Sequence, residues 1–62
     1  MNKELAGEIL GALYWCRCLK ISPKRWRKRI ADKLRNNGRM EMYGTETFCA
    51  TWDYLEAQGL IF

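Results

Sequence analysis

Residues 22–38 constrain the fold more than any other part of the chain, because residue types mark the start, the end and both faces of one helix. Ser22 can accept a hydrogen bond from the free N–H groups of a helix start, and Pro23 suits the first helical position. The Asn-Asn-Gly sequence at residues 36–38 tolerates the left-handed backbone that closes a helix. These signals predict a helix over residues 23–36.

Apolar residues recur every four positions within this helix. Trp26, Ile30 and Leu34, with Ala31 beside them, form a narrow stripe of about 80° around its axis. Such a stripe is typical of a helix that buries one side in a core. We expect these side chains to anchor the helix inward.

The opposite side of the helix is almost purely cationic. Its side chains are Lys24, Arg25, Lys28, Arg29 and Arg35, with Arg27 and Lys33 flanking the apolar stripe and Asp32 as the only acid. Like charges three and four residues apart repel one another, and solubility alone does not need so one-sided a face. The pattern favours a surface for a polyanion or an acidic protein, and the alternative is a solvated face that happens to be basic.

Charge is also segregated along the chain. Residues 17–39 hold ten of the eleven Lys and Arg residues and one acid, a formal charge of +9, whereas the remainder carries −5. If the partner is nucleic acid, contacts would be mostly to phosphates, with little readout of base sequence. The candidate contacts are Lys24, Arg25, Arg27, Lys28, Arg29, Arg35 and Arg39.

The length of 62 residues predicts one small domain, residues 1–62, that buries only about 60% of its unfolded surface. A hydrophobic content of 48%, with three Trp, three Tyr and two Phe, is nevertheless too high for a disordered segment. We expect a folded chain with a small core, to which self-association as a homodimer would add buried surface.

A second helical pattern covers residues 2–20, with Asn2 as its cap. Its broad apolar side consists of Leu5, Ala6, Ile9, Leu10, Ala12, Leu13, Cys16 and Leu19. On the other side Gly7 and Gly11 leave a shallow groove beside Trp15, and an aromatic anchor next to bare backbone suits a protein interface. The alternative is that Trp15 folds back over the end of the helix at 23–36.

A third helical pattern begins at Thr45, covers residues 46–58 and ends at Gly59. Its inward stripe is Phe48, Trp52 and Leu55, and its exposed side chains are Ala50, Thr51, Asp53, Tyr54 and Ala57. Tyr54 completes the candidate protein interface with Gly7, Gly11 and Trp15.

The predicted fold class is mainly α: a three-helix domain over residues 2–20, 23–36 and 46–58. Met and Glu alternate in residues 40–43, which fits a short strand and an extended loop equally well. The apolar residues 60–62 either pair with that segment as a second strand or plug the core.

Residues 48–61 resemble the end of the recognition helix and the following strand of winged helix-turn-helix regulators. The resemblance is carried by the spacing of Phe48, Trp52, Leu55, Gly59, Leu60 and Ile61. It implies a winged-helix-like fold without a full wing and a role in the regulation of transcription. The helix at 46–58 would expose Glu46, Asp53 and Glu56, which phosphates repel. The basic helix at 23–36 is therefore the predicted nucleic-acid contact.

The groups of common catalytic sites are missing. The chain has no His, and no Ser or Cys stands beside a plausible general base, so we expect neither enzyme activity nor a cofactor. Cys16, Cys18 and Cys49 lack the number and spacing of a structural zinc site. Cys16 and Cys49 are better interpreted as small buried hydrophobes.

The N-terminal pattern fits neither a signal peptide nor a membrane span, because Glu4, Glu8 and Arg17 interrupt it. We expect a cytoplasmic protein with reduced cysteines. Two functions are consistent with the sequence. One is a small basic regulator that binds nucleic acid, with DNA expected. The other is a protein-binding module or inhibitor, of the kind that phages and mobile elements encode, which docks its basic helix or Trp15 on an acidic host protein.

Overall fold

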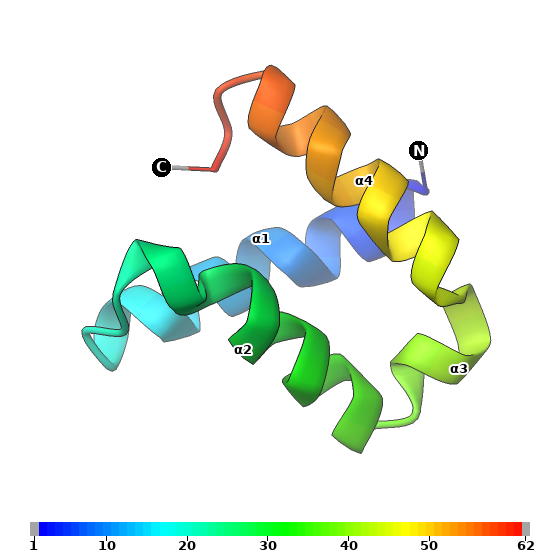
Figure 1. Ribbon diagram of the computed structural model, residues 1–62, viewed down its shortest axis with the longest axis horizontal. Helices are drawn as coiled ribbons and strands as arrows, with labels where there is room; N and C mark the ends of the chain where they lie inside the picture. Colours follow the sequence, from blue (N-terminus) through cyan, green and yellow to red (C-terminus); the bar gives the residue numbers. More distant parts are fainter. Residues whose placement is uncertain (1, 62) are drawn as a thin grey trace.

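The computed structural model describes residues 2–61, and the first of the four helices in this range is α1 (Lys3–Cys18) (Figure 1). The predicted cap is confirmed, since the side-chain oxygen of Asn2 accepts a 3.0 Å hydrogen bond from the Leu5 N–H. The buried side consists of Leu5, Ala6, Ile9, Ala12, Leu13 and Cys16. The prediction was wrong for Leu10 and Leu19, which are 38% and 56% exposed. Leu10 lies at the edge of the buried arc, and Leu19 lies beyond the last helical residue.

The second helix, α2 (Pro23–Asn36), has the predicted bounds. Its apolar stripe is confirmed, because Trp26, Ile30 and Leu34 are all buried. Ser22 occupies the N-cap position, but its side chain makes no capping hydrogen bond, which corrects the expected cap. At the other end Gly38 adopts a left-handed φ of 74°.

Residues 40–43 are helical, which corrects the expectation of a strand or loop. They belong to α3 (Arg39–Tyr43), where the Gly44 N–H closes a helical turn on the Met40 carbonyl at 2.8 Å. Positive φ angles at Gly38 and Gly44 turn the chain at both ends, and the segment between them has room for about one turn. No strand occurs within residues 2–61, so the pairing of 40–43 with 60–62 is wrong for the described residues, and residue 62 lies outside them.

The last helix, α4 (Thr45–Ala57), has Gly44 at its N-cap. The predicted inward residues Phe48, Trp52 and Leu55 are all buried. Thr51 is fully buried and not exposed as expected, and its hydroxyl oxygen accepts a 3.3 Å hydrogen bond from the backbone N–H of Asn2. After the helix, Gly59 has a left-handed φ of 74°, which ends the helix as predicted.

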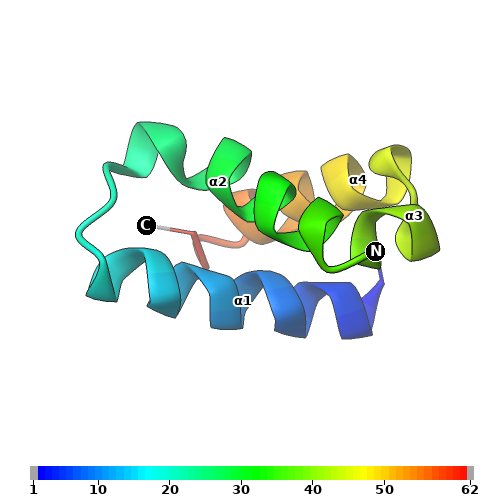
Figure 2. The same cartoon turned by 90° about the horizontal axis from the view of Figure 1, so that it is seen from below.

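The helices form two layers. Figure 2 shows α1 along one side of the molecule and α2 along the other, with α4 beside α2. Both α2 and α4 contact α1 and α3, and Figure 1 shows α3 linking the end of α2 to the start of α4, with the two helices running back from it in similar directions. The shared core gathers the buried side chains of all four helices, and Ile61 packs against it from the C-terminal segment. The outer side of α2 is therefore left to solvent.

Candidate nucleic-acid interface

Three of the seven candidate nucleic-acid contacts pair with carboxylates of the same chain. The pairs are Arg27 with Asp53 of α4 at 3.4 Å, Arg35 with Asp32 at 3.0 Å, and Arg39 with Glu8 of α1 at 3.2 Å. All six side chains keep between 30% and 66% of their exposure, and such exposed pairs contribute only about 0–1 kcal/mol to stability. Their main effect here is that each carboxylate offsets the charge of its arginine.

Each of the three tryptophans has a cation over its ring. The Arg17 guanidinium carbon lies 5.7 Å from the centre of the Trp26 ring, and that of Arg27 lies 6.0 Å from the centre of the Trp52 ring. The Lys33 ammonium lies 4.6 Å from the centre of the Trp15 ring. These contacts are attractive because a ring face carries negative charge density. They engage three of the ten cations of residues 17–39 in packing.

The other four candidates are exposed and form no ion pair with any residue between 2 and 61. They are Lys24, Arg25, Lys28 and Arg29. Arg25, Lys28 and Arg29 line a shallow hollow with Asp32, whose carboxylate binds Arg35. Within this hollow, three cations therefore face solvent beside one acid that is already paired.

A second hollow shares Arg25 and Arg29 and extends to Lys20 in the α1–α2 turn. Lys20 is exposed and has a left-handed φ of 57°. Sequence reasoning missed it because it was counted as the last residue of the helix at 2–20. Its place within the basic stretch 17–39 was the signal available. We call Lys20, Lys24, Arg25, Lys28 and Arg29 the basic patch.

The start of α2 lacks the usual electrostatic compensation. Its first turn contains no acid, and Lys24 and Arg25 lie near the positive end of the helix dipole. The Ser22 side chain adds no capping bond there. Cations at this position destabilise a helix, so an anion bound by the patch would relieve an existing repulsion.

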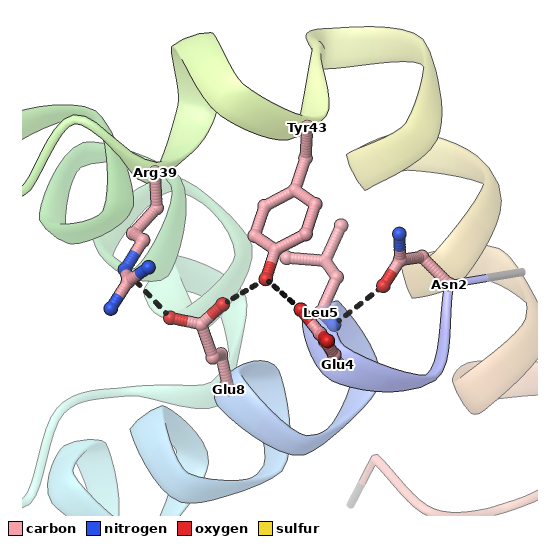
Figure 3. A network of polar contacts seen from close by, with 6 residues as sticks. All are labelled: Asn2, Glu4, Leu5, Glu8, Arg39 and Tyr43. Carbon is pink, nitrogen blue, oxygen red and sulfur yellow. Dashed lines mark hydrogen bonds and ion pairs between the residues drawn. The ribbon is translucent and has the colours of Figure 1, made fainter.

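At the other end of α2, a polar network joins α3 to α1 (Figure 3). The Tyr43 hydroxyl donates a 2.7 Å hydrogen bond to Glu8, and the Glu4 carboxylate lies 3.5 Å from the same oxygen. Arg39 completes the network through its pair with Glu8. The hydrogen bond to Glu8, aided by burial and by the two negative charges, raises the pKa of Tyr43 to about 12, although Arg39 opposes this shift. Arg39 is thus occupied in holding two helices together.

The candidate protein interface is dispersed. Gly7 and Gly11 are exposed, with open space where a side chain would project. Trp15 is half-buried against the core beneath Lys33, whereas Tyr14 is 69% exposed. Tyr54 is 44% exposed on α4. The exposed aromatic of α1 is therefore Tyr14, which the sequence reasoning did not single out.

The cysteines are unpaired and lie in three different environments. Cys16 is fully buried, and burial raises its pKa against the opposing charges of Arg29 and Lys33. Cys18 is exposed, and Cys49 packs half-buried against the core. In the range 2–61 no three His, Cys, Asp or Glu side chains converge to hold a metal ion. No helix in this range has the length and apolarity needed to cross a membrane.

Comparisons with protein-family models, with curated proteins and with solved structures each return no match.

Proposed function

We propose that this protein is a small nucleic-acid-binding regulator that contacts the phosphates of DNA through the basic patch at the start of α2. The observation that carries the proposal is a division among the cations. Arg27, Arg35 and Arg39 are offset by carboxylates, whereas the five cations of the basic patch have no acidic partner within residues 2–61.

The chemistry of the patch matches phosphate in two respects. Arginine can bind two oxygens of one phosphate with its planar donors, and lysine adds a flexible point charge. Binding releases the counterions condensed on DNA, so affinity falls steeply as salt rises. Four phosphate contacts give a slope of about −4 in a plot of log affinity against log salt concentration.

The proposal is tested by fluorescence anisotropy with a labelled DNA duplex of mixed sequence. Binding is expected at about 50 mM salt and should be largely lost at about 200 mM. The double variant Arg25→Gln with Arg29→Gln should weaken binding and make the salt slope shallower by about 2. Absence of binding at the lower salt concentration would refute the proposal.

A matched control separates local contacts from net charge. Arg27→Gln with Arg39→Gln removes the same number of guanidinium groups from positions that carboxylates already offset. Its slope should stay close to that of the unmodified protein. Equal losses in the two double variants would show that total charge, and not the basic patch, governs binding. Circular dichroism of each variant checks that the helices are intact.

A second candidate, a protein-binding module, is favoured by the outer face of α1. There Leu10 and Tyr14 are exposed beside the bare backbone of Gly7 and Gly11. Pull-down from lysate with and without nuclease tests it. A partner that survives nuclease treatment and is lost with Tyr14→Asp would support this candidate, whereas loss of all retained protein after nuclease would count against it.

A further inference from the structure

We infer that the basic patch binds double-stranded nucleic acid by its phosphate backbones and discriminates against single strands. This inference rests on the proposed function and goes beyond it, because it names the form of nucleic acid. It follows from the positions of the aromatic rings, from the shape of the patch, and from the rigidity of the element that carries it.

The tryptophans offer no platform on which a base could stack. Proteins that bind single strands hold successive bases against exposed aromatic rings, which supply much of the affinity. Trp26 and Trp52 are only 6% and 3% exposed. The ring of Trp15 is half-buried, and the Lys33 ammonium lies 4.6 Å from its centre. Trp26 and Trp52 are therefore closed to bases, and Trp15 lines a hollow with Arg29 and Lys33 in which the Lys33 ammonium already lies over the ring.

The exposed tyrosines lie on other helices than α2. Tyr14 is 69% exposed on α1, which runs along the opposite side of the molecule from α2 in Figure 2. Tyr54 is 44% exposed on α4. Neither lines the two hollows of the basic patch. A strand whose phosphates lie in these two hollows would therefore meet neither tyrosine ring.

The shape of the patch also suits a duplex. Single strands are bound in grooves that track the backbone, whereas a duplex accepts a helix in its major groove or against its phosphates. Four of the five cations project from the outer, solvent-facing side of α2. They form two rows, Lys24 with Lys28 and Arg25 with Arg29, in which neighbours are about 6 Å apart along the axis.

The helical backbone of α2 also favours a duplex over a single strand. A duplex presents one charge per about 1.7 Å of axis, at fixed positions, and each neutralised phosphate releases more counterion than on a single strand. Because α2 is a helix, its cations project from backbone positions that are already set, so it can meet such an array without ordering a flexible backbone. A single strand would have to be ordered on the patch, at an entropic cost that the buried rings of Trp26 and Trp52 cannot offset by stacking.

The test compares three labelled probes of equal length by anisotropy at about 50 mM salt: a duplex of about 24 base pairs, one of its component strands, and an oligothymidine. The duplex is expected to bind at least about tenfold more tightly than either single strand. Single strands that bind as tightly as the duplex would overturn the inference and leave the proposed function standing. If none of the probes binds, the proposed function itself fails.

Two variants strengthen the comparison. Arg25→Gln with Arg29→Gln should weaken duplex binding, whereas Tyr14→Ser should leave it unchanged, since Tyr14 is absent from the patch. If Tyr14→Ser reduces binding of the oligothymidine to below one half while that probe rivals the duplex, stacking on α1 contributes to binding and the inference is wrong.

Discussion

The ammonium group of Lys33 lies 4.6 Å from the centre of the Trp15 ring, so a residue of α2 packs over the largest side chain of α1. Trp15 is thereby half-buried against the core. Lys33 is therefore a cation of α2 that packs against an aromatic ring and does not belong to the basic patch. The same relationship recurs with Arg17 over Trp26 and Arg27 over Trp52.

Replacing Lys33 by Gln should lower the free energy of unfolding by about 0.5–1 kcal/mol, because the cation over the Trp15 ring is lost. Urea unfolding followed by circular dichroism measures the change. Lys28→Gln is the matched control, since Lys28 is exposed on the same helix and has no ring or acid partner within residues 2–61. Its effect should stay within about 0.5 kcal/mol. Equal effects of the two changes would contradict a stabilising contact.

The hydrogen bond from Tyr43 to Glu8 predicts a specific loss of stability at high pH. The pKa of Tyr43 is raised to about 12 in the folded chain, above the usual value of about 10. The protonated hydroxyl therefore stabilises the fold below pH 10, and this contribution disappears as the pH rises from about 10 to 12.

Comparison with Tyr43→Phe isolates this contribution, because other groups titrate in both proteins. The difference in free energy of unfolding between the unmodified chain and the variant should be constant from pH 7 to 9 and then shrink toward zero by about pH 12. A difference that stays constant across this window would show that the hydroxyl does not hold its proton through Glu8.

The two N-cap residues should respond differently to alanine. Asn2→Ala removes the hydrogen bond to the Leu5 N–H and should cost about 1 kcal/mol. Ser22→Ala should change stability by less than about 0.5 kcal/mol, because the Ser22 side chain caps nothing. Thermal and urea unfolding of both variants provide the measurement. A cost at Ser22 equal to that at Asn2 would mean that the hydroxyl does cap α2 in solution.

Two glycines should likewise respond in opposite directions. Gly44 has φ 88° and ψ 150°, a conformation nearly restricted to glycine, so Gly44→Ala should destabilise the chain by about 1–3 kcal/mol. Gly11 is an interior residue of α1 with open space around its missing side chain. Gly11→Ala should therefore stabilise the chain by about 0.5–1 kcal/mol. Destabilisation by Gly11→Ala would indicate that another surface covers this position, as in a dimer.

Local signals were sufficient for the long helices. The bounds of α2 follow from Pro23 at its start and from the Asn-Asn-Gly sequence at residues 36–38, and its stripe of Trp26, Ile30 and Leu34 is buried as expected. Both features depend on residues within a few turns of one another, which a sequence displays directly.

The short helix and the burial of single residues could not be found in this way. In α3, one turn of helix and a short strand both place Met40 inward, so five residues give too little periodicity to distinguish them. Thr51 is expected on the exposed side of the helix at 46–58, yet it is fully buried, and its hydroxyl oxygen accepts a hydrogen bond from the backbone N–H of Asn2, 49 positions away. Such contacts depend on how helices are placed in space.

For the candidate site, residue spacing was enough to predict that the cations gather on one side of α2, because the helical repeat fixes which positions share a face. Apart from the local pair of Arg35 with Asp32, the packing of the helices sets which of these cations remain available. Asp53, 26 positions from Arg27, and Glu8 of α1 come close to arginines through the packing of α4 and α3, and Coulomb attraction depends on that distance in space. Tertiary packing likewise covered Trp15 and left Tyr14 exposed, because it set which side of α1 faces α2.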